Sequence, residues 1–462
     1  MLMPGQHVHF VGIGGSGLSA IARVMLQRGY RVSGSDRQLN ELTAALARDG
    51  AVIYAGHRAE HIGDAALVII SSAVPADNPE VLAARARGLP VLKRSDILAE
   101  LMAGQVGVAV AGTHGKTTTT AMIVHILRET GRDPSFIVGG VVPGVGTNAG
   151  VGRGEAFVIE ADEYDHMFLG LQPTIAVITN IEHDHPDLFP TLEVLTEDFR
   201  RFAALLPADG LLIACADDPG AAKLAAERQS VGAVVTTYGL ASPQADWRAV
   251  DVQARGKGMA FRVVRAGRDI GAGLLSVPGA HNVQNALAAL IAAMRLGVPE
   301  KDALAALATY SGAGRRFEVR GQAGGVTVID DYAHHPTAIT VTLRAARAAY
   351  PQATIWAVWQ PHTFSRLRAL FDAFAAAFPP EAADHVLITD VYAAREQQSD
   401  GPGIPELIAR ISHPDVRHTP TLDSAVEALA VGVQPGDVVL ILSAGDAPTI
   451  GVRLLERLRQ GR

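Results

Sequence analysis

Residues 112–118, with the sequence Gly-Thr-His-Gly-Lys-Thr-Thr, have the types and spacing to bind a nucleotide phosphate. Glycines permit a tight turn whose backbone N–H groups converge on an anion, and a helix that starts there adds the positive end of its dipole. Lys116 would then reach the β- and γ-phosphates, and the Thr117 hydroxyl would bind Mg²⁺. The strict phosphate-loop pattern has a further glycine where this chain has Val110, so an ordinary structural turn is the alternative.

The segments on either side of this loop have the patterns needed to position it. Residues 108–111 are small or β-branched and apolar, which predicts a buried strand. Met122, Ile123, Ile126 and Leu127 recur at helical spacing after the loop. We therefore expect a strand, a glycine turn and a helix in succession, which is the arrangement that binds phosphate.

The composition is that of an ordinary globular protein, with 48% apolar and 19% charged residues among 462. This length suggests about three domains. The net charge of −7 argues against non-specific nucleic-acid binding. No apolar run is long enough to insert into a membrane and no signal peptide is evident, so we expect a cytoplasmic protein. The single cysteine, Cys215, lies in an apolar run and is expected to be a core residue rather than a catalytic thiol.

A second glycine-rich loop lies near the N-terminus. Gly12, Gly14 and Gly17 follow a strand-like run in the pattern Gly-x-Gly-x-x-Gly, and the strand predicted at 30–35 ends at Asp36. Taken alone, this is the fingerprint of a dinucleotide-binding Rossmann unit, and an NAD-dependent oxidoreductase is one interpretation of it. That interpretation leaves the lysine-containing loop without a role.

The polar residues that follow two later strands indicate a second half of the site. A buried-type strand at 156–160 leads into the acidic residues up to Asp165, and another at 174–181 leads into Glu-His-Asp-His. Carboxyl ends of parallel strands meet at one edge of a sheet. Glu160 is therefore a candidate Mg²⁺ ligand, with a solvated loop as the alternative. His183 and His185 are candidates for metal or substrate contact, with surface histidines as the alternative.

Further candidates lie in the C-terminal half. Asn282 and Asn285 are three residues apart and share a helical face, where they would either recognise a base edge or simply cap the helix. Residues 312–317 are predicted to form a linker with two arginines. From about residue 325 strands and helices alternate again, and polar runs occur at 330–337 and 360–366.

The chain is predicted to form three α/β domains. A Rossmann-like domain is expected at 1–104 and a phosphate-loop ATPase-type domain at 105–313, the latter with a mostly parallel sheet and a small antiparallel part at about 230–278. A second Rossmann-like domain is expected at 314–462. Two local predictions concern helices: Asp77 is expected to be the N-cap of a helix, and 364–378 is expected to be one continuous helix.

Taken together and in order, these stretches resemble the Mur ligases of bacterial peptidoglycan synthesis across all three predicted domains. Each motif is weak alone, but the ordered set is specific, and Gly-Thr-x-Gly-Lys-Thr is the form of the phosphate loop that this family uses. The motifs that carry the resemblance are residues 12–17, 71–73, 77–79, 112–118, 160–165, 180–185, 281–285, 331–337 and 360–366.

The resemblance implies an ATP- and Mg²⁺-dependent ligase that adds L-alanine to UDP-N-acetylmuramic acid through an acyl phosphate. Arg200 stands where several sister ligases carry a carbamylated lysine, which agrees with an alanine-adding enzyme. Tyr164 replaces the usual serine of the acidic motif, which keeps a ligase that reattaches recycled peptides as the alternative. Thr363 stands where arginine is common, which weakens the expected substrate anchoring. A non-catalytic nucleotide-binding regulator is a further alternative. A monomer or homodimer is expected.

The resemblance also implies roles for individual residues. Mg²⁺ would be held by Thr117, Glu160 and His185. ATP would be bound by Gly112, Thr113, His114, Gly115, Lys116, Thr117, Thr118, Asn282, Asn285, Arg316 and Asp331. The UDP-sugar would be bound by Gly14, Gly15, Ser16, Asp36, His57 and Ser72, and the carboxylates of the substrates by His335 and Arg366. The residues expected to serve catalysis directly are Lys116, Glu160, His185, Arg316, His335 and Arg366.

Overall fold

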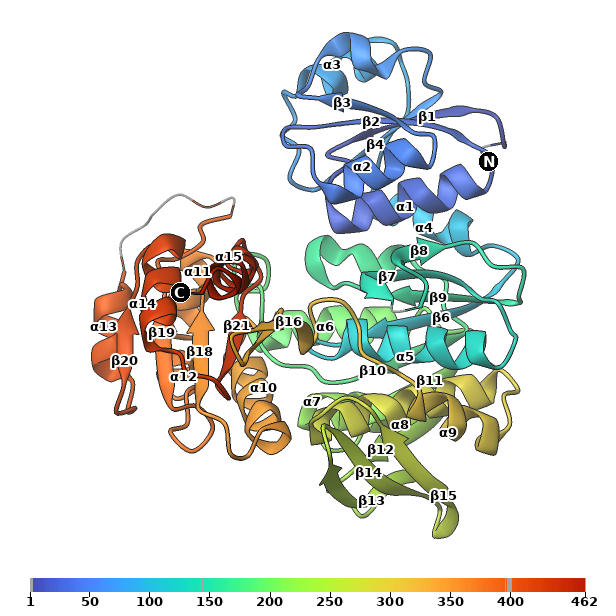
Figure 1. Ribbon diagram of the computed structural model, residues 1–462. Helices are drawn as coiled ribbons and strands as arrows, with labels where there is room; N and C mark the ends of the chain where they lie inside the picture. Colours follow the sequence, from blue (N-terminus) through green and yellow to red (C-terminus); the bar gives the residue numbers. More distant parts are fainter. Residues whose placement is uncertain (1–2, 143, 395, 397–400, 462) are drawn as a thin grey trace. The chain divides into compact units, whose positions relative to one another are not determined.

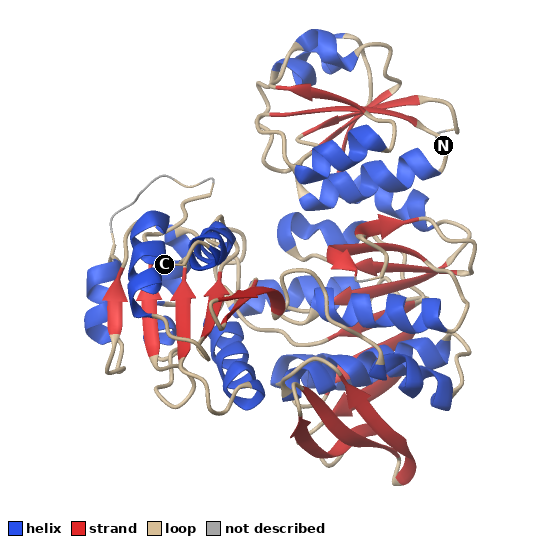
Figure 2. Ribbon diagram, viewed as in Figure 1, coloured by secondary structure: helices blue, strands red, loops and turns tan. Residues whose placement is uncertain are grey.

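The structure is a computed structural model that describes residues 3–142, 144–394, 396 and 401–461. Its strands lie in three sheets, drawn red in Figure 2, and the helices that pack on them are blue. Over the described ranges, no helix is both long and apolar enough to cross a membrane. By internal contacts the chain divides into two compact units. The first unit comprises Met1–Glu182, Glu193–Arg248 and Asn285–Ala306, and the second comprises His183–Leu192, Ala249–Gln284 and Leu307–Arg462.

The N-terminal sheet of the first unit has five strands, all parallel, in the order β3-β2-β1-β4-β5 (Figure 1). Its elements are β1 (His7–Val11), α1 (Ser16–Gln27), β2 (Arg31–Asp36), α2 (Glu41–Arg48), β3 (Val52–Ala55), the 3₁₀ helix η1 (Ala59–Ile62), β4 (Leu67–Ile70), α3 (Pro79–Ala86), β5 (Val91–Lys93) and α4 (Arg94–Met102). Crossover helices connect the parallel strands, of which β1 and β4 are largely buried, and this is the Rossmann-like pattern expected from the sequence.

The N-cap of α3 differs from the prediction. Asn78, and not Asp77, is the cap, and its Oδ1 accepts hydrogen bonds from the backbone N–H groups of Glu80 and Val81. The helix begins at Pro79, so the residue directly before it is the one whose side chain reaches the exposed N–H groups of the first turn.

The central sheet begins with the predicted strand, glycine turn and helix. Within the first unit its strands run in the order β12-β11-β10-β6-β9-β7-β8, and all pairs are parallel except β7 with β8. The elements are β6 (Val106–Ala111), α5 (Lys116–Glu129), β7 (Ser135–Val142), β8 (Thr147–Gly150), β9 (Ala156–Glu160), the 3₁₀ segment η2 (Tyr164–Gly170), β10 (Ile175–Ile178), α6 (Leu192–Ala203), β11 (Leu211–Cys215), α7 (Pro219–Ser230) and β12 (Val234–Gly239). Cys215 is buried, as expected.

The predicted antiparallel segment starts later than expected. Strand β12 pairs in parallel with β11, and the first residues of β13 (Trp247–Arg255) pair in parallel with β12. The antiparallel pair consists of β14 (Gly258–Arg265) and β15 (Arg268–Leu275). Helix α7 returns the chain to the edge from which β11 started, so β12 extends the parallel sheet. Helices α8 (Ala280–Arg295) and α9 (Glu300–Ala308) follow.

The C-terminal sheet, in the second unit, has the order β16-β17-β21-β18-β19-β20 and is parallel apart from β16. Its elements are β16 (Glu318–Ala323), β17 (Val326–Asp331), α10 (Pro336–Ala349), β18 (Ile355–Trp359), α11 (Phe364–Ala369), α12 (Phe371–Ala375), β19 (His385–Ile388), α13 (Ile404–Arg410), β20 (Val416–His418), α14 (Leu422–Gly432), β21 (Val438–Leu442) and α15 (Pro448–Arg459). The sheet is therefore Rossmann-like, as predicted.

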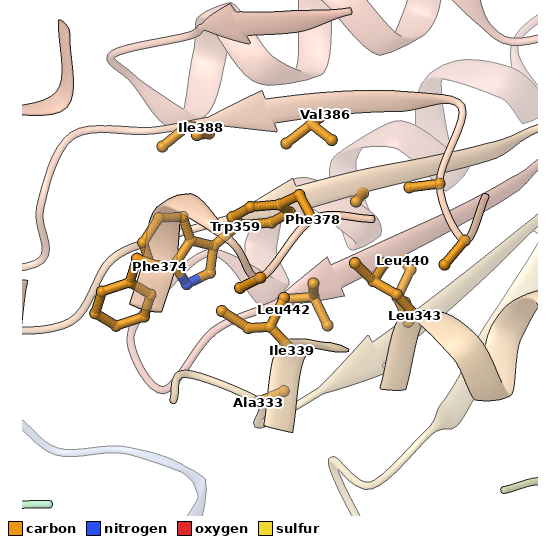
Figure 3. Packing of buried hydrophobic residues seen from close by; sticks show 14 of the residues in the cluster. Ala333, Ile339, Leu343, Trp359, Phe374, Phe378, Val386, Ile388, Leu440 and Leu442 are labelled. Atoms are coloured by element: carbon orange, nitrogen blue, oxygen red, sulfur yellow. The ribbon is translucent and has the colours of Figure 1, made fainter. Parts of the chain in front are cut away.

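The core of this sheet explains one further difference from the prediction. Trp359 is fully buried, and its ring centroid lies 4.7 Å from that of Phe374 and 5.4 Å from that of Phe378 (Figure 3). The segment 364–378 is not one helix, because the backbone leaves the helical conformation at Leu370, between α11 and α12. The predicted helical pattern is continuous in the sequence, whereas packing around the indole decides the path of the backbone.

Candidate active site

The loop between β6 and α5 has the backbone of a phosphate-binding turn. Gly112 has φ of +135° and Gly115 has φ of +84°, a region that L side chains rarely adopt. A Cβ on Gly112 would lie 1.9 Å from Thr179 Oγ1, and one on Gly115 would lie 2.5 Å from Asn285 Oδ1. Because α5 begins at Lys116, the N–H groups of its first turn point out of the helix toward the loop. Asn285 therefore packs against the predicted phosphate loop.

The buried Glu163 carboxylate holds the Lys116 ammonium beside this turn. Its Nζ donates to the Gly112 carbonyl at 2.6 Å and to both carboxylate oxygens of Glu163, at 2.8 and 3.0 Å. Burial opposes the charge on this lysine, but Glu163, Asp162 and Glu160 outweigh it, so the pKa of Lys116 is raised. The ammonium is thus charged and faces the residues that follow β9.

Thr117 and Glu160 together have the donors that Mg²⁺ prefers. The Thr117 hydroxyl donates to Glu160 Oε1 at 3.0 Å, and Glu160 Oε2 accepts the backbone N–H of Gly139 at 2.6 Å. Magnesium binds hard oxygen ligands, commonly a hydroxyl beside a carboxylate at the phosphate end of a nucleotide. The residues present therefore fit such an ion. Thr118, the next residue of α5, is buried.

Residues that follow β10 brace the loop from the side. The Asn180 carboxamide accepts the His114 backbone N–H at 2.8 Å and donates to the His114 carbonyl at 3.1 Å. Thr113 Oγ1 donates to the Glu182 carbonyl and accepts the Glu182 N–H, both at 2.9 Å. The His114 Nε2 atom lies 2.8 Å from Glu182 Oε2. The polar residues that follow β10 thus hold in shape the turn that follows the adjacent strand β6.

The N-terminal glycine loop is closed by a carboxylate. The Gly14 backbone N–H donates to Asp36 Oδ2 at 2.8 Å, and the Asn40 side chain donates to the Gly14 carbonyl at 3.0 Å. Gly15 is the N-cap of α1, and Ser16 is the first residue of that helix. The structure thus brings Gly14 and Asp36 together. The Asp36 carboxylate thus occupies one backbone N–H group of this loop.

His57 and Ser72 each contact a carboxylate, His57 that of Glu80 and Ser72 that of Asp165. His57 Nδ1 is 3.0 Å from Ser35 Oγ and 3.0 Å from Glu80 Oε2. Ser72 Oγ donates to Asp165 Oδ2 at 2.6 Å, and Lys93 Nζ donates to the same carboxylate at 3.0 Å. Burial would raise the pKa of Asp165, but Ser72 and Lys93 outweigh burial and lower that pKa.

In the second unit, Asp184 brings His185 and Arg366 together. Arg366 Nε donates to Asp184 Oδ1 at 2.8 Å, and both side chains are at least 95% buried. His185 Nε2 lies 3.8 Å from Asp184 Oδ2, and Arg366 Nη2 lies 3.5 Å from His185 Nδ1. Burial would raise the pKa of Asp184, but His185 and Arg366 reverse this, and that pKa is held well below its usual value. The arginine that was predicted to anchor a substrate carboxylate is thus oriented by a carboxylate of the protein.

Asp331 is the last residue of β17, and His335 directly precedes α10. His335 is the N-cap of α10, where its Nδ1 accepts the Thr337 N–H at 3.4 Å, and its Nε2 lies 3.3 Å from the His183 carbonyl. The Asp331 carboxylate accepts backbone N–H groups of residues 317 and 333, at 2.7 and 2.8 Å. Burial raises the pKa of Asp331, although Arg316 opposes that shift. Both side chains therefore shape the backbone at the carboxyl end of β17.

The remaining predicted contacts have local partners as well. The Arg316 guanidinium lies 4.9 Å from the centre of the Tyr332 ring, a cation–π distance. Asn282 Nδ2 donates to the Pro278 carbonyl at 2.7 Å. Arg200, at the lysine position of sister ligases, pairs with Glu227 at 2.8 Å on the surface of α6.

Sequence reasoning missed the role of three acidic residues, Glu80, Glu163 and Asp184. Each is buried and holds a basic residue that was predicted to serve the site: His57, Lys116 and Arg366 respectively. Glu163 and Asp184 lie inside the polar runs that were recognised, so their position after a strand was the available signal. Glu80 follows a helix cap and has no such signal.

Family models match most of the chain. The Mur ligase family catalytic domain matches residues 7–106, the Mur ligase middle domain matches 110–293, and the Mur ligase glutamate ligase domain matches 315–445. The matches follow each other along the chain in this order.

Curated proteins and solved structures are similar over the full length. The chain is 46% identical to UDP-N-acetylmuramate–L-alanine ligase of Renibacterium salmoninarum, over 98% of this chain and 96% of that protein. It is 43% identical to the ligase of the same name from Pelotomaculum thermopropionicum, over 99% of this chain and 98% of that protein. The solved UDP-N-acetylmuramate-alanine ligase of Thermotoga maritima superposes with a TM-score of 0.83 at 29% identity, over 99% of this chain and 100% of that one. A murein peptide ligase of Psychrobacter arcticus superposes with a TM-score of 0.74 at 28% identity, over 98% of this chain and 99% of that one. With three family models matched in order and relatives of this identity along its whole length, the chain belongs to the Mur ligase family.

Proposed function

We propose that this chain is an ATP-dependent carboxylate–amine ligase that joins L-alanine to the carboxylate of UDP-N-acetylmuramic acid. The observation that carries the proposal is the 46% identity, over 98% of the chain, to a protein named for that reaction. The geometry of the phosphate loop supports the ATP-dependent half, because Lys116 and Thr117 meet two acidic residues at one edge of the central sheet.

The reaction needs activation because a carboxylate anion is a poor electrophile. An oxygen of the muramic acid carboxylate attacks the γ-phosphorus of ATP, the bond to the β-phosphate oxygen breaks, and ADP leaves an acyl phosphate behind. The neutral amine of L-alanine then attacks the acyl carbon, phosphate leaves, and the nitrogen loses a proton. An anion that attacks an anionic phosphate needs concentrated positive charge, so positioning and charge neutralisation are the main tasks of the protein.

Lys116 and Arg316 are the cations proposed to neutralise the phosphates, and Glu163 keeps Lys116 charged and aimed at the loop. Thr117, Glu160 and His185 are proposed to hold Mg²⁺, which would supply further positive charge at the phosphates. Thr113, His114 and the glycines form the loop that would surround the phosphates, and the N–H groups at the start of α5 would point toward them. Asn282, Asn285 and Asp331 are proposed to contact the nucleoside.

We further propose a division of labour among domains with boundaries at 1–104, 105–313 and 314–462. The first would bind the UDP-sugar through Gly14, Gly15, Ser16, Asp36, His57 and Ser72. The second would bind ATP. The third would bind the amino acid, with His335 and Arg366 as anchors for the carboxylates of the two substrates.

The test is phosphate release from ATP and Mg²⁺ with UDP-N-acetylmuramic acid, measured with and without L-alanine. Release that requires both substrates is the expected result. Release with the peptide L-Ala-γ-D-Glu-diaminopimelate and not with L-alanine would instead support the recycling reaction, which Tyr164 and the similarity to a murein peptide ligase favour. No release with either acceptor would overturn the ligase proposal.

A further inference from the structure

A fully buried carboxylate lies in the first turn of α3, in the N-terminal sheet. Glu80 has no exposed surface. Ser35, at the end of β2, donates to its Oε2 at 2.6 Å, and His57 Nδ1 lies 3.0 Å from the same oxygen. His61 of η1 places Nδ1 3.0 Å from Oε1. His9 of β1 contributes Nε2, 3.6 Å from Oε1 and therefore beyond hydrogen-bond distance.

These contacts keep the carboxylate ionised. Burial alone would raise the pKa of Glu80, but its interactions with His9, Ser35 and His57 outweigh burial and lower that pKa to about 2. A buried anion needs N–H and O–H donors or a cation beside it. His57 Nδ1 must therefore carry its proton toward Glu80, which leaves Nε2 on the opposite side of the ring.

The other two histidines near Glu80, His9 and His61, have further contacts of their own. His9 is fully buried, its Nδ1 lies 2.7 Å from Ser33 Oγ, and burial lowers its pKa. The same Ser33 hydroxyl lies 2.7 Å from His7 Nε2. His61 stacks on Tyr54, with ring centroids 4.3 Å apart and planes 5° apart. Of the three histidines around Glu80, His57 has the most exposed side chain, at 15%.

His57 also lies where this fold binds ligands. Strand β3 pairs with β2 so that Ala55 is opposite Asp36, and His57 comes two residues after Ala55. His57 therefore follows the carboxyl end of β3, next to the strand end that supplies Asp36 to the glycine loop. In open α/β sheets, ligands bind outside the carboxyl ends of the strands.

We propose that Glu80 is a positioning residue for the nucleotide-sugar: it accepts the Nδ1–H of His57 and so orients the ring, which presents Nε2 to the nucleotide-sugar for a hydrogen bond. This rests on the function proposed above, since the ligand is the UDP-sugar of that reaction. Glu80 itself touches no substrate in this scheme. It acts through His57, as carboxylates beside functional histidines do elsewhere.

The test is Glu80→Gln, which keeps the shape of the side chain and removes its charge. We expect the KM for UDP-N-acetylmuramic acid to rise by roughly 10- to 100-fold, the range typical of such supporting groups, with kcat and the KM for ATP unchanged. The histidines that face Glu80 are His9, His57 and His61, with His7 beyond them.

Glu60→Gln is the matched control, because Glu60 is an exposed glutamate of η1 in the same domain. It should leave all constants unchanged. Equal KM values for Glu80→Gln and wild type across the pH range, in a variant that melts normally, would overturn the proposal. Calorimetric titration with the UDP-sugar alone separates this from failure of the ligase function, because binding is read without turnover.

A second measurement does not depend on the variant folding. Nitrogen-15 NMR of the histidines in the wild-type protein reports which ring nitrogen carries the proton. We expect His57 to be protonated at Nδ1 and its Nε2 signal to shift when the UDP-sugar binds. A neutral His57 protonated only at Nε2, or no shift on binding, would overturn the proposal.

Discussion

The chain has two glycine-rich turns, each between a buried strand and a helix, and different groups bond to the two turns. In the first, the Gly14 N–H is already bonded to the Asp36 carboxylate. In the second, Lys116 adds a cation that is paired with Glu163, and the Asn180 carboxamide bonds the backbone of His114. The comparison teaches that a glycine turn supplies only the backbone shape. The residues around it decide whether it attracts a triphosphate or another part of a substrate.

The largest expected effect is at the second turn. Lys116→Ala should lower phosphate release by roughly 100- to 1000-fold, because a preorganised charge at the transferred phosphate is lost. The variant also leaves the buried Glu163 without its cation, so the double variant Lys116→Ala/Glu163→Gln should recover stability and stay inactive. Phosphate release and thermal melting measure the two effects. The control is Lys223→Ala, which changes an exposed lysine of α7. Near-normal turnover of Lys116→Ala would contradict the assignment of Lys116 to the phosphate site.

Alanine substitutions would compare the two turns sterically. Gly112→Ala places a Cβ 1.9 Å from Thr179 Oγ1 at φ of +135°, and should cost on the order of 1–3 kcal/mol of stability and raise the KM for ATP. Gly15→Ala meets only the Gly12 carbonyl at 3.6 Å, so the change should be at most about 1 kcal/mol. Urea unfolding and ATP saturation curves measure both. Equal effects of the two variants would remove the distinction between the turns.

Asp36→Ala probes the electrostatic difference at the first turn. It removes the acceptor of the Gly14 N–H, and a hydrogen bond to a charged group contributes roughly 1.5–3 kcal/mol. We expect a rise of about 10-fold or more in the KM for the UDP-sugar, with the KM for ATP unchanged. Initial-rate kinetics with each substrate varied in turn provide the measurement. An effect on ATP instead would mean that the roles of the two turns had been exchanged.

The smallest expected effect concerns stability in acid, and it sharpens the description of the first turn's surroundings. The pKa of Glu80 is lowered from 4.5 to about 2 in the folded protein. A depressed carboxyl pKa stabilises the fold fully above the unfolded value, and this stabilisation is lost as the pH falls from about 4.5 toward 2. The stability difference between wild type and Glu80→Gln should therefore be constant near neutrality and shrink below pH 4.5. Urea midpoints at several pH values test this, and a difference that does not change with pH would contradict it.

Local patterns predicted most of the fold. Strand β6, the turn and α5 follow from an apolar run, two glycines and a helical spacing, all within one short segment. The order of the domains follows from the same kind of signal. The errors arise where the pattern of residue types is not enough. A cap one residue away from Asp77, a break at Leu370 and the parallel pairing of β12 depend on backbone geometry that residue types do not encode.

Residue types and their spacing, by themselves, determined the phosphate loop, the family resemblance and the basic residues expected at the site. Tertiary structure alone decided which acid faces each of them: Glu163 faces Lys116, Asp184 faces Arg366, and Glu80 faces His57. The physical reason is the separation along the sequence over which each effect acts. Periodicity and turn chemistry act over a few residues, whereas the charge of a buried side chain is set by whichever groups the fold brings within hydrogen-bond distance, regardless of their separation in the sequence.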